Sequence, residues 1–366
     1  MKKYKLAVIG ANTPLLPFFK RINRSLFEIH TFAWDEGAVC KEYSDKFYPI
    51  SFTQKESILD ICREIGINGV TSFSLESAVP TVVYVGSHLG LNVNSDEVLG
   101  WNGHKNCMRK ILSSAGLLMP KYVLFKNSKK EDISHLKFPL IIKPADGGGS
   151  RGVTLISCIN ELNSAVEEAL KYSRIKEVVV EEYVDGKEFS VEYISYQGKH
   201  YYVSITDKTT SEAPHFVELK HHQPTSLNDE QICKVKELVE SSLTVLGITN
   251  SPSHTELKFN FEGKPVIIEV GPRMGGDRIT SDLVEYSTGY DFVNAACLLA
   301  CGQFVKPEYS RTIPTTVLFN TPQTQYEVNK IINDAQVELL QRNLSELNLT
   351  CNNNSERSGC IIYRGY

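Results

Sequence analysis

The chain of 366 residues carries a net charge of −4, with 22% charged and 42% apolar residues. This length favours two or three domains over one small core, and the composition excludes disorder throughout the chain. Lysines are spread along the chain rather than gathered in runs, so we expect no nucleic-acid partner.

The N-terminal segment and the cysteines bear on location. "MKKYKLAVIG" has the two lysines of a signal peptide, but its apolar run ends at Gly10, and we interpret it as a first strand. The longest apolar stretch, residues 292–304, is far shorter than the ~20 residues that span a bilayer, so we expect no membrane partner. Nine cysteines without CxxC spacing argue against a disulfide framework and a zinc site, which fits a reducing cytoplasm.

Residues 1–96 alternate strand-like and helix-like segments. Strands are predicted over 5–10, 26–33 and 67–73, and helices over 14–23 and 55–66. Such alternation predicts a parallel, doubly wound sheet. The turn "GANTPL" is not GxGxxG, so a dinucleotide site here has little support.

The strict alternation stops near residue 96. Helices are predicted over 103–116, 160–173 and 229–247, with an apolar helix ending near Gly302. Strands flank a glycine-rich loop in 138–156, and two more surround the turn Asp185-Gly186. This region is therefore expected to be α+β with antiparallel hairpins. The tail from about residue 303 is less patterned and ends in a predicted strand over 360–366.

The segment 254–273 predicts a hairpin that places two carboxylates together. If Glu262-Gly263 is a two-residue loop, Glu256 lies opposite Glu269, while Phe259–Val266 and Leu257–Ile268 pairs form a buried side. Directly opposed like charges destabilise a sheet unless a cation lies between them or one carboxyl is protonated. Oxygen ligands on rigid strands suit Mg²⁺, and the alternative is two solvated glutamates on an exposed hairpin.

The segment "IIKPADGGGSRG" indicates a site for phosphate. Lys143 ends a strand, and the glycines that follow let backbone N–H groups approach an anion closely. The loop is not the Walker form, because its lysine precedes the glycines. The alternative is a flexible turn between two strands.

The segment "EEYVDGKEFSVE" follows as an acidic hairpin. Glu181 ends a strand, backbone groups of residues 182–184 are able to pair with an adenine edge, and Glu188 is able to accept hydrogen bonds from ribose hydroxyls. Alone, this pattern is commonplace. Its value lies in the order of the parts along the chain.

That order carries a resemblance. "KNCMRKIL", "PLIIKPADGGGSRGV", "VVVEEYVDGKEFSVE", "HTELKF" and "PVIIEVGPRMGGD" resemble the ATP-grasp superfamily in type, order and approximate spacing, over roughly residues 1–305. "ITDKTTSEAPHFVELKHHQP" and "SERSGCIIYRGY" resemble segments of its carboxylate–amine ligases, typified by bacterial L-amino-acid ligases.

The resemblance implies an architecture of mixed α/β and α+β class. An N-terminal Rossmann-like (pre-ATP-grasp) domain would span 1–96 and an ATP-grasp domain 97–305, with a nucleotide-binding lid subdomain at about 119–186. A small C-terminal segment, 306–366, would pack on the ATP-grasp domain.

The resemblance also implies roles for particular residues. Lys105 and Lys143 would hold ATP phosphates, and Glu256 and Glu269 would bind Mg²⁺. Arg273 would contact the transferring phosphoryl group or the substrate carboxylate. The remaining nucleotide contacts would come from the loop residues Gly147, Gly148, Gly149 and Ser150, the adenine-pocket residues Glu181, Glu182, Tyr183 and Val184, and the ribose ligand Glu188. Gly271 stands where the family commonly has an asparagine as a further metal ligand, which puts a second Mg²⁺ in question.

The implied activity is ATP- and Mg²⁺-dependent joining of a carboxylate, expected from an amino acid, to an amine through an acyl phosphate. Lys208 and His254 are the catalytic candidates beside Arg273. Further acceptor-side candidates are His221, His222, Gly275, Gly276 and Asp277. The alternatives are a purine- or cofactor-type ligase or carboxylase acting on another small acid, and a nucleotide-binding descendant without turnover. A homodimer is the commonest assembly expected.

Overall fold

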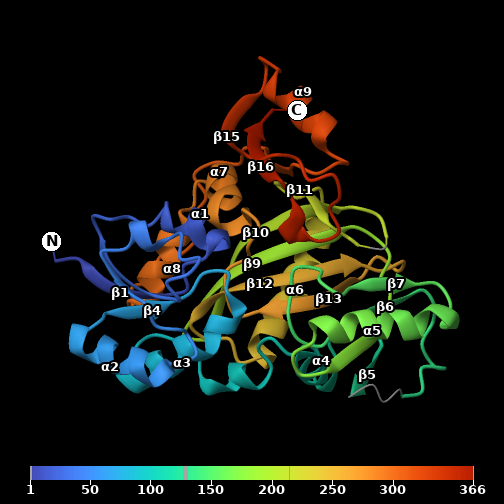
Figure 1. The fold of residues 1–366 in the computed structure, drawn as a ribbon, viewed down its shortest axis with the longest axis horizontal. Coiled ribbons are helices and arrows are strands. Elements are labelled where there is room, and N and C mark those ends of the chain that lie inside the picture. The colour runs from blue at the N-terminus through green and yellow to red at the C-terminus, as the bar shows by residue number, and fades with distance from the viewer. Residues whose placement is uncertain (1, 127–130, 214, 366) are drawn as a thin grey trace.

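A computed structural model describes residues 2–126, 131–213 and 215–365. Three β-sheets organise the chain, with the N-terminal part at one side, a helix-covered small sheet at the other and the C-terminal strands above them (Figure 1). The predicted mixture of a parallel α/β part and an antiparallel α+β part is confirmed. Among the described residues, no helix is long and apolar enough to cross a membrane.

The N-terminal sheet is parallel and has the strand order β3-β2-β1-β4. Its strands are β1 (Tyr4–Ile9), β2 (Phe27–Phe32), β3 (Lys46–Tyr48) and β4 (Gly69–Thr71). Helices α2 (Lys55–Ile65) and α3 (Val79–Leu89) bury one face of the sheet, and α8 (Phe292–Ala300) buries the other. Because α8 follows the hairpin 254–273 in the chain, its packing fixes that hairpin beside the N-terminal sheet.

The predicted helix over 14–23 is wrong in length. A 3₁₀ turn (Thr13–Leu15) is followed by only one turn of helix, α1 (Leu16–Phe19). The N–H of Asn23 is taken by the Asn294 side chain of α8 at 2.8 Å, and the Asn23 side chain accepts the Ser25 N–H. These bonds end the helical segment because they satisfy the backbone outside a helix.

The small antiparallel sheet has the order β5-β8-β6-β7. Its strands are β5 (Tyr122–Lys126), β8 (Glu177–Glu182), β6 (Leu140–Pro144) and β7 (Thr154–Ile156). Helix α5 (Leu162–Tyr172) packs its apolar residues onto one face of this sheet. The glycine-rich loop connects β6 to β7, so its position depends on a rigid, helix-backed support.

The large sheet is antiparallel and combines distant parts of the chain in the order β13-β12-β9-β10-β11-β14-β16-β15. The strands are β9 (Glu188–Tyr196), β10 (Lys199–Thr210), β11 (Glu218–Gln223), β12 (Ser251–Phe259), β13 (Pro265–Gly271), β14 (Thr315–Phe319), β15 (Glu338–Leu344) and β16 (Gly359–Arg364). Helices α4 (Lys105–Ser114) and α6 (Asp229–Val245) share a core with β9, β12 and β13. The C-terminal tail is thus more regular than predicted. It adds three strands to this sheet and carries α9 (Gln325–Ile332); Tyr366, the end of the predicted last strand, lies outside the described residues.

The predicted hairpin about Asp185-Gly186 is wrong. Strand β8 pairs with β5 and β6, whereas β9 pairs with β10 and β12, so the two strands belong to different sheets. Gly186 has a φ of +133°, and a Cβ there would lie 2.7 Å from the Phe259 carbonyl oxygen. The segment 183–187 is therefore a close crossing between the small and the large sheet.

The hairpin of β12 and β13 has the predicted Glu256–Glu269 pair but a different local register. Phe259 lies opposite Pro265 and Leu257 opposite Ile267, so both predicted apolar pairs are wrong. Asn260 closes a longer loop, because its N–H donates to the Lys264 carbonyl at 3.0 Å. A bulge between Leu257 and Glu256 then shifts the register back, which restores the carboxylate pair.

Candidate active site

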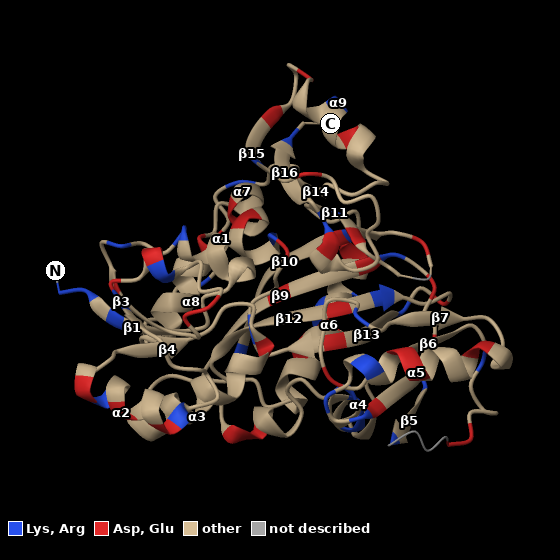
Figure 2. Cartoon of the chain, in the orientation of Figure 1, with Lys and Arg blue, Asp and Glu red and all other residues tan. Residues whose placement is uncertain are grey.

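The paired carboxylates lie half-buried where the large sheet approaches α4. Glu256 contacts Lys208 (Oε1 to Nζ, 2.8 Å), and Glu269 contacts Lys105 (Oε1 to Nζ, 3.3 Å). Figure 2 shows basic and acidic segments close together at this end of the large sheet, which faces β6 and β7. Two partly exposed carboxylates on adjacent strands are oxygen donors of the kind that Mg²⁺ takes while keeping waters.

Lys208 is the buried centre of an acidic cluster. Its Nζ lies 2.7 Å from Glu188 Oε1 and 2.8 Å from both Glu218 Oε1 and Glu256 Oε1. Burial alone would lower the pKa of Lys208, but the three carboxylates together raise it well above its usual range. Lys208 is only 6% exposed, so it is not a solvated lysine at a strand end.

The same cluster contains the proposed ribose ligand and a residue that sequence reasoning missed. Glu188 opens β9, and its other oxygen lies 3.9 Å from Lys258. Glu218 lies on β11, and burial would raise its pKa, but Lys208 and His221 hold that pKa well below its usual range. Glu218 lies in the segment "ITDKTTSEAPHFVELKHHQP", but nothing in the local pattern distinguishes it from a surface glutamate.

The two predicted phosphate lysines are buried beside the glycine-rich loop. Lys143 forms an ion pair with Glu181, and Lys105 donates from Nζ to the Gly147 carbonyl at 2.6 Å. Burial is the main reason that the pKa of Lys143 is lowered. Positive charges held in a low-dielectric site attract and bind a polyanion strongly.

Arg109 is a third buried cation here and was missed. It is 0% exposed, and its Nη2 lies 2.5 Å from Glu181 Oε2 and donates to the Ile268 carbonyl at 3.2 Å. Burial would raise the pKa of Glu181, but Arg109 and Lys143 lower it. Arg109 lies four residues after Lys105 on one helix, so both side chains lie on the same face. This spacing is the sequence feature from which Arg109 could have been predicted as a site residue.

The glycine-rich loop borders open space at the positions where side chains would stand. A Cβ at Gly147, Gly148 or Gly149 would meet no atom within 4 Å, and Ser150 has a φ of +58°. Gly152 differs, because a Cβ there would lie 2.7 Å from the Tyr172 ring of α5. The loop therefore has an open part, free to approach a ligand, and an anchored end.

The predicted adenine segment crosses between the two sheets. Glu182 faces the small sheet, where its Oε1 accepts the Lys137 N–H at 3.0 Å. The Tyr183 ring packs 5.8 Å from the Phe216 ring and 4.9 Å from Lys258 Nζ. Val184 follows directly, half-buried, before the crossing at Gly186. Lys258 links this segment to Glu188, because its Nζ lies near both the Tyr183 ring and Glu188 Oε2.

His254 on β12 and Arg273 just after β13 lie at the end of the hairpin that carries Glu256 and Glu269. His254 is opposite Gly271; its Nδ1–H donates to Glu192 at 2.5 Å, and its Nε2 lies 3.5 Å from Glu256. Burial alone would lower the pKa of His254, but Glu192 and Glu256 raise it to about 9. A Cβ on Gly271 would lie 3.4 Å from the Arg273 side chain, which therefore covers the position where the family carries asparagine.

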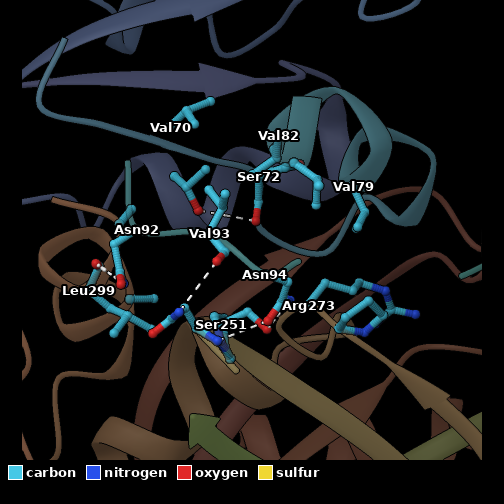
Figure 3. A pocket seen from close by; sticks show the side chains of 17 residues that line it. Val70, Ser72, Val79, Val82, Asn92, Val93, Asn94, Ser251, Arg273 and Leu299 are labelled. Carbon is cyan, nitrogen blue, oxygen red and sulfur yellow. Dashed lines mark hydrogen bonds between the residues drawn. The ribbon is translucent and has the colours of Figure 1, made fainter. Parts of the chain in front are cut away.

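Arg273 also faces the N-terminal domain. Its Nη2 lies 3.6 Å from Glu76 Oε2, just before α3. It lies at one edge of a pocket between β4, α3 and the start of β12 (Figure 3). The cavity holds about 40 Å³, which is enough for water and far below the volume of a substrate pocket.

The acceptor-side candidates separate into two groups. His221 is fully buried, and its Nδ1–H donates to the Asp277 carbonyl at 3.1 Å. The Asp277 carboxylate pairs with Arg357 from the C-terminal tail. His222 points elsewhere and bonds Thr316 at 2.8 Å. The structure thus brings His221 and Asp277 together but leaves His222 apart.

Comparison with known proteins agrees with this geometry. Residues 136–282 match the family described as the ATP-grasp domain. The chain is 26% identical over 246 residues to the alanine–anticapsin ligase of Bacillus subtilis, covering 60% of this chain and 51% of that protein. It is 29% identical over 247 residues to the uncharacterized protein y4rH of Sinorhizobium fredii, covering 66% and 50%. The chain thus spans about half the length of these curated relatives.

Solved structures extend the similarity to the whole chain. An L-amino acid ligase from Bacillus licheniformis aligns with a TM-score of 0.77 and 25% identity, over 100% of this chain and 95% of that one. An ADP complex of N5-carboxyaminoimidazole synthetase from Staphylococcus aureus gives 0.78 at 14% identity, over 100% and 94%, and shares the fold. Residues 136–282 therefore match the ATP-grasp domain family, and the chain as a whole shares its fold with the L-amino acid ligase.

Proposed function

We propose that the protein is an ATP- and Mg²⁺-dependent ligase that joins an amino-acid carboxylate to an amine. The observation that supports this most is the convergence on one site of three groups: two buried lysines, an open glycine-rich loop and a pair of facing glutamates. These are Lys105, Lys143, residues 147–150, Glu256 and Glu269. The similarity to alanine–anticapsin ligase and L-amino acid ligase supports an amino-acid substrate.

The side chains fit a nucleotide with Mg²⁺. Glu256 and Glu269 would hold the metal, which supplies charge neutralisation on the phosphates during phosphoryl transfer. Lys105 and Lys143 bind phosphate oxygens once the nucleotide competes with Glu269 and Glu181 for their ammonium groups. Glu188 accepts hydrogen bonds from the ribose hydroxyls, and the 147–150 loop closes over the phosphates to exclude water.

In the reaction, a carboxylate oxygen attacks the γ-phosphorus and the bond to the ADP oxygen breaks, which leaves an acyl phosphate. The amine then attacks the acyl carbon, loses a proton, and inorganic phosphate departs. Arg273 neutralises the reacting anions, and Lys208 and His254 hold Glu256 in place. Positioning and charge neutralisation account for such a step without a covalent nucleophile from the protein.

The test is phosphate release from Mg²⁺-ATP, screened over pairs of amino acids. Release that requires both a carboxylate and an amine, with the amide seen by mass spectrometry, supports the proposal. Release with one small acid alone, or with bicarbonate, favours a purine- or cofactor-type ligase or carboxylase. ATP binding without turnover favours a non-catalytic descendant, the candidate suggested by Gly271.

The remaining expectations belong to the same proposal. We place the domain boundaries at 1–96, 97–305 and 306–366, and the enzyme in the cytoplasm with all nine cysteines as free thiols. A homodimer is the expected assembly, and light scattering on the purified chain would measure it.

A further inference from the structure

The turn after Arg273, residues 275–277, is held from two sides by buried groups. The N–H of Gly275 donates to Glu192 Oε2 at 3.3 Å. At the other end, the Asp277 carbonyl accepts the His221 Nδ1–H at 3.1 Å, and the Asp277 carboxylate pairs with Arg357. The turn is therefore anchored at one end by Glu192 and at the other end by His221 and Arg357.

The turn needs these anchors, because its own backbone is unfavourable. Asp277 and Arg278 are consecutive non-glycine residues with φ of +49° and +67°. Each such residue is strained unless its surroundings impose the conformation. Gly275 has no space for a side chain, since a Cβ would lie 2.6 Å from His254 Nδ1 and 2.7 Å from Glu192 Oε1.

Both anchors are connected to the proposed metal ligand Glu256 through a series of side-chain contacts. On one side, Glu192 bonds His254 at 2.5 Å, and His254 lies 3.5 Å from Glu256. On the other side, Glu256 contacts Lys208, Lys208 contacts Glu218 at 2.8 Å, and Glu218 lies 3.0 Å from His221.

These side chains come from neighbouring strands in fixed register. His254 of β12 lies opposite Glu192 of β9, and Lys208 of β10 lies opposite His221 of β11. Acidic and basic side chains alternate along the whole path, and all but Glu256 are at most 8% exposed. Such a network of paired side chains is rigid, because any member that moved would leave its partner's buried charge unpaired.

We propose that Glu192 and Glu218 are positioning residues that hold the 275–277 turn as part of the substrate-binding surface, in register with the metal-binding carboxylates. This inference rests on the proposed function for its kinetic consequence. Glu192 makes its hydrogen bonds to His254 and Gly275, whereas Glu218 shares Lys208 with the proposed ribose ligand Glu188. The KM for ATP is therefore expected to be independent of Glu192. Binding of the substrate that contacts Arg273 and the glycines after it is expected to depend on Glu192.

The test variant is Glu192→Gln. A carboxylate accepts from both His254 and Gly275, whereas an amide has one acceptor oxygen and turns an N–H₂ group toward the other donor. The matched control is Tyr193→Phe, which removes the bond from the next residue of β9 to Glu240 (3.0 Å), an exposed residue of α6 on the opposite face. Both variants alter one buried hydrogen-bonding group of the same strand.

Two measurements decide the proposal. Hydrogen exchange of a peptide covering 274–280 is expected to accelerate about tenfold in Glu192→Gln and to stay unchanged in Tyr193→Phe. In turnover assays, the KM for the amino-acid substrate is expected to rise about tenfold while the KM for ATP stays constant. Gly275→Ala, which displaces the turn without altering any charge, is expected to give the same pattern and serves if Glu192→Gln does not fold.

Unchanged exchange at 274–280 in both Glu192→Gln and Gly275→Ala would overturn the proposal. So would equal rises in both KM values, because these would indicate a general loss of structure. A wild-type enzyme without turnover rejects the proposed function, whereas the exchange measurement still decides whether Glu192 holds the turn.

Discussion

Replacing Lys208 with methionine tests how much the buried acidic cluster depends on the cation at its centre. The substitution keeps an unbranched apolar side chain one atom shorter and removes the ammonium that lies within 2.8 Å of Glu188, Glu218 and Glu256. Loss of one partner from a buried ion pair costs about 3–5 kcal/mol. Since three carboxylates share this cation, we expect the upper part of that range.

The expected change is large enough for a thermal scan. At roughly 2 °C per kcal/mol for a chain of this size, Lys208→Met lowers the unfolding midpoint by roughly 8–10 °C. The matched control is Lys220→Met on the adjacent strand β11, which removes a half-exposed pair with Glu327 at 2.9 Å and costs ~0–1 kcal/mol. Equal midpoints for the two variants would refute the view that Lys208 neutralises the cluster.

Acid pH supplies an independent check on the same reasoning. Burial would raise the pKa values of Glu218 and Glu256, but Lys208 lowers them both. Carboxyls with a lowered folded-state pKa contribute stability above their unfolded value near 4.5 and lose it as the pH falls through the folded value. The difference between wild type and Lys208→Met should therefore shrink below about pH 4.5. A difference that persists there would indicate lost packing rather than lost charge.

Four further predictions test other parts of the site. Glu269→Gln should lower turnover by orders of magnitude with an unchanged circular dichroism spectrum, and a wild-type rate would remove the metal assignment. Because the pKa of His254 is raised to about 9, its contribution to stability is complete below its unfolded value of 6.5 and is lost as the pH rises through 9. Denaturant unfolding should show wild type losing up to ~3 kcal/mol relative to His254→Gln between pH 6.5 and 9.5, and parallel curves would contradict the shift. Gly152→Ala should destabilise by ~1–3 kcal/mol through the Tyr172 contact, whereas Gly148→Ala, with no atom within 4 Å, should leave the midpoint nearly unchanged. Glu181→Gln leaves Arg109 and Lys143 without their counter-ion, so both cations are available to phosphate. ATP should therefore raise the melting temperature of this variant more than that of wild type, and an equal rise would argue against phosphates near these cations.

Tertiary contacts decided several features that local pattern misjudged. The strands on either side of Gly186 have good hairpin spacing, but each finds more pairing partners in a different sheet. Lys208 and Glu192 look like ordinary strand residues until β9, β10 and β12 become neighbours. Only then are their charges buried together, and no local periodicity reports which strands will be adjacent.

The sequence by itself determined the parts of the site whose geometry is local. The alternation of residues 1–96 determined a parallel sheet. A strand period of two placed Glu256 and Glu269 on one face; the loop is longer than predicted and shifts the register, and the bulge shifts it back, so the predicted pair is kept. The tertiary structure alone decided which cation each carboxylate meets, because Lys105, Arg109 and Lys208 reach them from other elements. Short-range order follows from backbone geometry, whereas the pairing of buried charges follows from the sheet order that brings distant segments together.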